Sequence, residues 1–578
     1  MRILFYPYII IFLLLFFKHF SFSHFWSKLK ISVDPVIIVI LLIGICFQVL
    51  SVWFMGVSLL GSVRYCCGHI PDNHLFLAIT NELMHRFPPY EPGVYGAILQ
   101  NYHFLSHLVV ADIINVFHLP LVATTYQFMP WILSFALGMS AIAIGSILQL
   151  GKSFIRWLLF FLYFGADGVF IILFLTRGAF PFALNAMEAG SGLLFNYPRA
   201  FSVIILITCF CWLTIWYRKK LLLTGIITAI VFGTVYGYKA YTGLFVWPGL
   251  AILGALAIIR KDKQSALMIA GALIIGLTLH FSTNRESGGM FFSGMWRIHD
   301  FFAMKEVGLP NMLLARQVFV EHSNWLRIVL SDSIMAVIFL IATFGTKLTA
   351  LIQTPTSLKK FPLELHLLLL SGIISSFILG MFFLQTQGGS NTGSFLVTIF
   401  IACSLYSALS VSHILVPFFR SFFWVVAICI IVMTIPRSLW MTYKNIKDFS
   451  VPVSPNQKED MKLFQFIRTN TPKGSLILPI GFSLTYENLW MKYFTDKNIY
   501  ILGNPGAQEV NNTMIYREDI LRQVQTTTDE KKLKKLLASE HINHLLVQKG
   551  SFIPKASVSN IFKLLYTSPN YEFFEIVQ

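Results

Sequence analysis

Charged residues are scarce in this sequence. Asp, Glu, Lys and Arg make up 12% of the 578 residues, about half the share in a typical soluble domain, whereas hydrophobic residues make up 56%. The charge that is present is mainly positive, with 44 Lys and Arg against 27 Asp and Glu. This composition excludes an ordinary soluble globular protein. The basic residues occur in short loops between apolar runs, which argues against nucleic acid as a partner.

Cysteine is also scarce, with seven residues in the chain. None of them forms a Cys-x-x-Cys pair, so the sequence supports neither a zinc site nor a disulfide framework. The adjacent Cys66 and Cys67 have no evident partner. The last hundred-odd residues contain no cysteine, no Gly-rich phosphate loop and no nucleophile elbow. We therefore interpret them as a module that caps the site or handles an acceptor, and not as the catalytic centre.

Long apolar runs are what the sequence has in abundance, and its mean hydropathy is +0.68. Runs of roughly 17–25 apolar residues span the hydrocarbon layer as helices. The sequence therefore predicts an α-helical polytopic membrane protein with about 11–12 transmembrane helices. The eleven clear spans are expected near 35–58, 124–149, 154–175, 200–216, 221–238, 243–259, 265–282, 326–346, 363–384, 394–416 and 421–437. The run Ile3–Phe17 is short for a span and is predicted to be retained as a twelfth span, an interfacial helix or a signal-like segment.

The basic residues alternate with the spans. If the helix near 35–58 runs outward, every basic cluster falls on the cytoplasmic side, as the positive-inside rule requires. These clusters contain Lys28, Lys30, Lys152, Arg156, Arg218, Lys219, Lys220, Arg260, Lys261, Lys263, Lys347, Lys359, Lys360 and Arg420. The predicted domains are then a multi-span domain, 1–440, and an extracytoplasmic α/β domain, 441–578. The expected location is a plasma (inner) membrane.

The outer loop 61–123 is much longer than a simple connection, which indicates a functional loop. It predicts an amphipathic helix that begins near Asp72 and ends near Arg86, with Asp72 at or beside its N-cap. A second helix is expected over 104–119, lying on the membrane. Ionisable residues concentrate in this loop and at the other outer ends of the spans.

Short stretches of the sequence resemble the GT-C glycosyltransferase superfamily. In the loop they are Pro71-Asp72-Asn73-His74-Leu75-Phe76, Glu82-Leu83, Pro88-Pro89 and Asn101-Tyr102-His103-Phe104. In the last domain they are Phe466–Pro472 and Ile542–Val547. Many members carry two adjacent acidic residues in this loop, whereas here Asp72 is followed by Asn73. The resemblance implies sugar transfer from a polyprenyl-phosphate donor to a glycan, lipid or protein acceptor, in contact with membrane lipids.

The resemblance assigns Asp72 as the base that takes the proton of the acceptor hydroxyl. A departing phosphate also needs cationic partners. Lys239 is the leading candidate, because a lysine at membrane depth usually faces a cavity or a partner. The other candidate substrate-binding residues are Arg199, Arg285, Arg297, His103, His107 and Glu82. Glu188 is a candidate second acidic group or metal ligand; the sequence itself requires no metal or other cofactor.

Each of these residues also has a purely structural interpretation: Asp72 as a helix cap, Lys239 as a side chain reaching the interface, and the histidine pair as packing. Two other functions stay open. A polysaccharide polymerase or ligase would use basic residues of the late outer loop, Arg285, Arg297, Arg316 and His322. A lipid or solute transporter would show internal repeats and charged or broken helices near mid-membrane.

Overall fold

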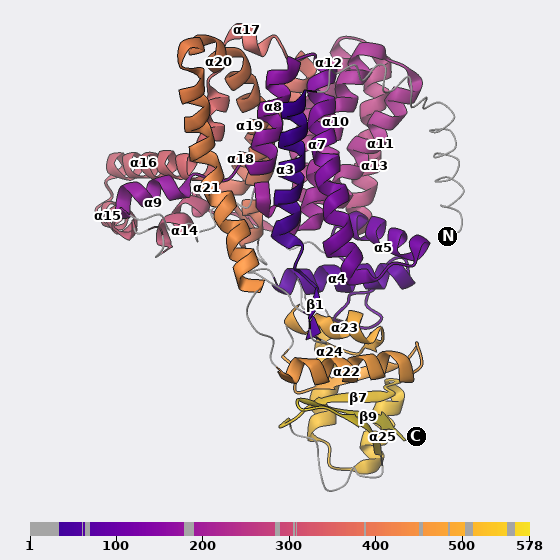
Figure 1. The fold of residues 1–578 in the computed structure, drawn as a ribbon. Helices are drawn as coiled ribbons and strands as arrows, with labels where there is room; N and C mark the ends of the chain where they lie inside the picture. The colour runs from indigo at the N-terminus through magenta and orange to yellow at the C-terminus, as the bar shows by residue number, and fades with distance from the viewer. Residues whose placement is uncertain are drawn as a thin grey trace.

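The computed structural model shows a long helical bundle, a lobe that projects from its side, and a small α/β domain at one end (Figure 1). It describes residues 34–59, 62–63, 70–178, 190–283, 289–304, 307, 309–385, 389–449, 455–483, 486–502, 512–551 and 561–577. The run Ile3–Phe17 and the pair Cys66–Cys67 lie outside these residues.

Each of the eleven predicted spans contains a helix. Among the described residues, nine helical stretches are long and apolar enough to cross a membrane, and one bent pair brings the number to ten. The range 221–238 forms α11 (Leu222–Tyr238), whose 17 residues rise about 26 Å, slightly less than the hydrocarbon core. The chain is therefore a multi-pass membrane protein, as predicted. The other upright helices are α3 (Pro35–Val52), α7 (Met129–Ile147), α8 (Gly151–Phe164), α10 (Tyr197–Lys219), α12 (Ala240–Ile259), α13 (Lys263–Thr283), α18 (Leu363–Phe382), α19 (Phe395–Ser410) and α21 (Phe423–Phe449).

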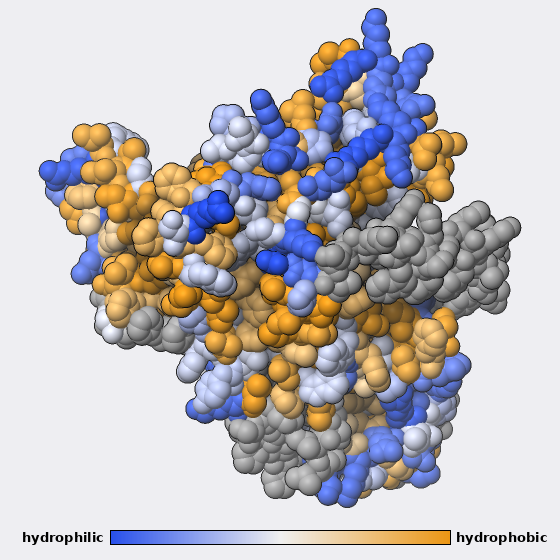
Figure 2. Space-filling model, turned by 45° about the horizontal axis from the view of Figure 1, so that its top comes forward, coloured by the Kyte–Doolittle hydropathy of each residue, from blue (hydrophilic) through white to orange (hydrophobic). Residues whose placement is uncertain are grey.

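Basic residues gather at the end of the bundle opposite the α/β domain. Arg156 pairs there with Asp34, and Lys220 pairs with Asp262. Figure 2 shows hydrophilic residues gathered over this end, beside flanks that are largely hydrophobic. The predicted clusters in the described loops therefore share one face, with the exception of Lys347. That this face is cytoplasmic remains a prediction from the positive-inside rule.

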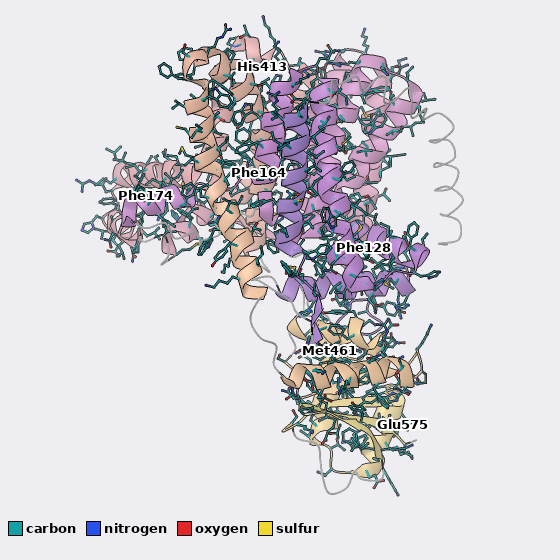
Figure 3. The ribbon with its side chains drawn as sticks, viewed as in Figure 1. Phe128, Phe164, Phe174, His413, Met461 and Glu575 are labelled. Atoms are coloured by element: carbon teal, nitrogen blue, oxygen red, sulfur yellow. The ribbon has the colours of Figure 1, made fainter. Side chains whose placement is uncertain are left out.

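The predicted span 154–175 is interrupted midway. Its two parts, α8 and α9 (Val169–Arg177), meet at a bend of 71°. Figure 3 shows Phe164, the last residue of α8, between His413 at the basic end and Phe128 near the other end. A Cβ at Gly168 would lie 2.9 Å from the Cα of Gly345, so the two backbones meet here at a distance that only glycine permits.

Beyond this bend the chain enters the lateral lobe. The lobe contains α9, α14 (Trp296–Ala303), α15 (Pro310–Glu321) and α16 (Trp325–Phe344). The range 326–346 is helical as predicted and is apolar enough for a span, but α16 runs across the direction of the bundle helices (Figure 1). Periodicity and hydropathy give a helix's length, whereas its direction depends on what it packs against.

Three charged residues are buried beside the bend, which corrects the prediction that ionisable residues concentrate at the outer surface. Arg437 of α21 donates from Nε to Asp167 at 3.0 Å, and the two side chains are 3% and 0% exposed. Lys347, predicted as part of a basic surface cluster, is instead 1% exposed. Its Nζ lies 3.0 Å from the centroid of the Phe400 ring, where a cation–π interaction offsets part of the cost of burial.

Asp167→Asn is expected to destabilise the protein strongly, because it leaves Arg437 as a buried cation without its carboxylate. Breaking one side of a buried ion pair costs about 3–5 kcal/mol. A thermal-unfolding midpoint measured in detergent should fall clearly below that of the wild type. Ser438→Ala is the matched control, since it removes only a neutral hydrogen bond to the Phe164 carbonyl at the same place, worth about 1 kcal/mol. Equal midpoints for Asp167→Asn and Ser438→Ala would contradict the prediction.

Two helices of the loop 61–123 lie at the end of the bundle that faces the α/β domain (Figure 1). They are α4 (Ile70–His85) and α5 (Leu105–Phe117), close to the ranges that the sequence predicts. Asp72 lies in the first turn of α4, inside the helix and not at the cap. A Cβ at Gly237 of α11 would lie 2.4 Å from Leu105, so this glycine lets α5 approach the bundle closely.

The C-terminal domain has a five-stranded mixed sheet in the order β6-β5-β7-β9-β8. The central β5 and β7 are parallel, and β9 and β8 continue the sheet antiparallel. This confirms the predicted α/β class. The strands are β5 (Leu476–Ile480), β6 (Asn498–Ile499), β7 (His544–Gln548), β8 (Phe562–Thr567) and β9 (Tyr571–Ile576), and the helices are α22 (Pro455–Asn470), α23 (Trp490–Thr495), α24 (Asn512–Thr526) and α25 (Glu530–Ser539). The predicted boundary at 440/441 falls inside α21, which continues to Phe449.

Candidate functional site

The polar residues at the start of α4 differ in their exposure to solvent. Asp72 is exposed in the first turn, whereas Asn73 and His74 behind it are buried. Burial lowers the pKa of His74 to about 4, so this imidazole is neutral at physiological pH. The following run, Leu75–Ile79, is almost completely buried and anchors the helix beneath the bundle. This packing holds Asp72 at the end of the bundle that faces the α/β domain while leaving its side chain open to solvent.

A buried hydrogen-bond network joins α4, α5 and α10. The Thr80 hydroxyl lies 2.8 Å from the Tyr197 hydroxyl and 3.2 Å from Nδ1 of His107, and Tyr197 also bonds to that nitrogen. Tyr197 is placed here by the start of α10, where the Asn196 side chain caps the helix and Pro198 occupies its first turn. The network holds α5 against the bundle through His107; His103, the other predicted histidine, lies two residues before α5.

Lys239 lies at the junction of α11 and α12, in extended conformation between the two helices. Its Nζ is 5.7 Å from the centroid of the Tyr241 ring, and Arg199 donates from Nε to the Tyr241 hydroxyl at 3.2 Å. Burial and, to a smaller extent, nearby Arg199 lower the pKa of Lys239 to about 7, although the Asp72 carboxylate opposes both effects. Lys239 therefore interacts electrostatically with two residues that were predicted separately from it, Arg199 and Asp72.

The two histidines belong to the same cluster. Burial, with a smaller contribution from the Lys239 cation, lowers the pKa of His107 to about 3 and that of His103 well below its usual value. Both rings are therefore neutral at physiological pH and can form hydrogen bonds but supply no positive charge. We name the set Asp72, His103, His107, Arg199 and Lys239 the outer cluster, after the location that the positive-inside rule predicts for it.

Two other predicted site residues, Glu82 and Arg297, form ion pairs with residues outside the outer cluster. Glu82 is buried and pairs with Lys492 of the C-terminal domain and, at 3.1 Å, with Arg86. Arg297 lies in the lateral lobe, where it pairs with Asp300 at 3.0 Å. A Cβ at Gly393 would be 3.4 Å from the Arg297 guanidinium, so this side chain covers the turn that contains Gly393. Glu188 and Arg285 lie outside the described residues.

Sequence reasoning missed the aromatic and hydroxyl residues that connect the cluster. Thr80, Tyr197 and Tyr241 supply its described hydrogen bonds. The available signal was that Tyr197 and Tyr241 each lie two residues from a predicted cation at the outer end of a span. Tyrosine is common there, because its ring is apolar and its hydroxyl needs a polar partner.

Within the described ranges, no group of three or more His, Cys, Asp and Glu side chains could hold a metal ion. His103 and His107 supply two nitrogens, whereas a protein metal site generally has three or more ligands. The described part of the outer cluster therefore does not fit a resident metal. Its buried cations and neutral imidazoles fit an anionic, hydroxyl-bearing ligand.

Comparison with known proteins agrees with the fold. No family model matches the sequence, and no curated protein matches it significantly. The crystal structure of the oligosaccharyltransferase of Archaeoglobus fulgidus with Zn and sulfate matches with a TM-score of 0.51 and 13% identity, over 89% of this chain and 68% of that chain. The same enzyme tethered with an acceptor peptide gives 0.50 and 12% identity, over 89% and 68% of the two chains. The mycobacterial arabinofuranosyltransferase AftD matches at 0.49 and 11% identity, over 94% of this chain and 40% of that chain.

At this identity, the likeness to the oligosaccharyltransferase shows the fold and nothing further. It confirms the predicted GT-C-like architecture, a polytopic helical membrane domain followed by a small C-terminal domain. What the outer cluster does has to be argued from its own residues.

Proposed function

We propose that this GT-C-fold protein is an integral membrane glycosyltransferase. In this proposal it moves a sugar from a polyprenyl-phosphate-linked donor to a glycan, lipid or protein acceptor at the outer face of a plasma membrane. The supporting observation is the outer cluster. The buried Lys239 interacts electrostatically with the exposed Asp72 carboxylate and with the buried Arg199, at the end of the bundle where the loop helices meet the C-terminal domain.

The reaction needs a base beside the attacking hydroxyl and positive charge beside the departing phosphate. The acceptor hydroxyl attacks the anomeric carbon, and its proton passes to the Asp72 carboxylate. The bond between that carbon and the phosphate oxygen breaks, and its electron pair leaves with the phosphate. Lys239 and Arg199 then stabilise the charge that grows on the leaving group. Neutral His103 and His107 are suited to hydrogen-bond sugar hydroxyls or phosphate oxygens without adding charge.

The polymerase or ligase alternative receives less support. It depends on basic residues of the late outer loop, but Arg316 pairs with Asp332, with its Nε 2.5 Å from the carboxylate, and Arg297 pairs with Asp300. These acidic partners offset the positive charge that such a site would use. The transporter alternative draws on the buried charges Asp167, Lys347 and Arg437. Asp167 and Arg437 are already paired with each other, which favours a structural role.

The proposal is tested with purified protein in liposomes that contain polyprenyl-phosphate sugars labelled in the sugar and a mixture of envelope acceptors. We expect label to appear in a product that is no longer linked to phosphate. Movement of intact labelled lipid between leaflets without any glycosidic product would contradict transfer and favour a transporter. Elongation of a preformed glycan without consumption of the lipid monophosphate sugar would favour a polymerase.

A further inference from the structure

The C-terminal domain contacts the helix that carries Asp72 through buried polar groups. Glu82 of α4 forms an ion pair with Lys492 of α23, and the two side chains are 3% and 6% exposed. The His74 ring lies parallel to that of Tyr493, with the centroids 6.0 Å apart, and Nδ1 of His74 is 2.7 Å from the Tyr493 hydroxyl. Both contacts come from adjacent residues of the short helix α23, and they reach the two ends of α4.

The rim of the same contact is more exposed. His85 bonds to Asp496 at 2.9 Å, and Arg86 bonds to Asn498 at 3.4 Å. Exposed polar contacts of this kind contribute little free energy, because water competes for each partner. The buried pair at the centre differs, since a Glu82 carboxylate without Lys492 would lose its main partner away from solvent.

Backbone contacts also hold the C-terminal domain against the loop 61–123. The Leu502 amide donates to the Gly93 carbonyl at 2.8 Å, and Val94 forms an isolated antiparallel bridge with Ile501. Docking of the domain on the loop 61–123 therefore does not depend on α23 alone. This separation allows the effect of docking to be distinguished from the effect of the α23 side chains on α4.

We infer that Lys492 and Tyr493 are positioning residues for transfer: α23 fixes the place of Asp72 by holding Glu82 at one end of α4 and His74, two residues from Asp72, at the other. The inference rests on the proposed function of Asp72. It makes the C-terminal domain part of the reaction machinery, whereas the sequence suggested only a cap or an acceptor module. Neither residue touches the reacting atoms. Each acts through α4.

The test compares Tyr493→Phe and Lys492→Met with the wild type in the liposome assay. Tyr493→Phe removes only the hydroxyl, and we expect kcat to fall about tenfold with KM for the donor little changed, because a displaced base slows the chemistry but not binding. Lys492→Met is expected to lower kcat further. Tyr516→Phe is the matched control, since its hydroxyl bonds to Glu540 on an exposed part of the same domain. It should leave both constants unchanged.

A disulfide distinguishes positioning from docking. Val94→Cys and Ile501→Cys, at the isolated bridge, would tie the domain to the loop in a background with Cys66→Ser and Cys67→Ser. Positioning predicts that Tyr493→Phe stays slow in the oxidised, tied protein. Full recovery of kcat on oxidation would show that the hydroxyl serves docking alone and would overturn the inference.

Hydrogen exchange tests the same point without the enzyme assay. Loss of the Tyr493 hydroxyl should speed exchange in the first half of α4 by about fivefold, as expected for one buried hydrogen bond. Unchanged exchange in both Tyr493→Phe and Lys492→Met would overturn the inference, whatever the activity. Absence of transfer in the wild type would instead count against the proposed function, whereas active wild type with equally active variants would refute the positioning role alone.

Discussion

Asp72→Asn is expected to lower the rate of sugar transfer by about 10²–10⁴-fold, the range for loss of a general base. The amide has nearly the same shape as the carboxylate but cannot accept the acceptor's proton. Asp72 is exposed in the first turn of α4, so the substitution should leave folding and membrane insertion unchanged. The measurement is kcat for labelled donor at saturating acceptor, with the thermal midpoint recorded for the same preparations.

The matched control is Glu364→Gln, at the opposite end of the bundle. Glu364 pairs with Arg260 at 3.2 Å on the basic face, far from the outer cluster, and its loss should leave kcat unchanged. If Asp72→Asn transferred sugar at the wild-type rate, Asp72 would only stabilise the first turn of α4. The base would then have to be sought among other acidic residues of the outer face.

Lys239→Met is expected to lower kcat/KM by about 10²–10³-fold, the effect of removing one preorganised group that stabilises transition-state charge. Met keeps most of the length and the apolar stem of the side chain but removes the ammonium, and with it the cation–π contact with Tyr241. Donor binding should weaken as well, because the ammonium faces phosphate in both the ground state and the transition state. Equal kcat/KM values for the variant and the wild type would place the phosphate away from this junction.

The pH profile gives an independent test of the same residue. Burial, with a further contribution from Arg199, lowers the pKa of the Lys239 ammonium to about 7. The ammonium form is fully present well below that pH and is lost as the pH rises through it. The kcat/KM of the wild type should therefore decline above pH 7, approaching a tenfold loss per pH unit.

The variant Lys239→Arg shows whether the decline near pH 7 comes from the titration of Lys239 or of another group. A guanidinium stays charged throughout the range, so the decline near pH 7 should disappear even if the bulkier side chain lowers the maximum rate. A decline that remained at the same pH in Lys239→Arg would assign it to another group and contradict the role of the lysine ammonium.

The sequence alone determined the helical membrane domain. A membrane helix satisfies its backbone internally and needs about twenty apolar residues, so the eleven ranges could be located from hydropathy without knowledge of their neighbours. The basic clusters predicted one polar end for the same reason, since each loop carries its own charge. The α/β class of the last domain and a helix starting beside Asp72 are also local properties of short segments. Lys239 could be predicted because charge at membrane depth is unusual, and Arg199 because it is a cation at the predicted outer end of a span.

Only the tertiary structure shows which residues of these helices and strands contact one another. The sequence predicts Glu82 as a substrate-binding residue, whereas its pairing with Lys492, more than four hundred residues away, depends on where the C-terminal domain docks. The close approach of Gly168 to Gly345 beside the bend and the burial of Lys347 against Phe400 are likewise contacts between segments remote in sequence. Hydropathy and periodicity describe a residue's own helix, whereas ion pairs and close backbone contacts form between segments remote in sequence. The outer cluster is assembled by such contacts between α4, α5, α10 and the α11–α12 junction, so only the tertiary structure could show it.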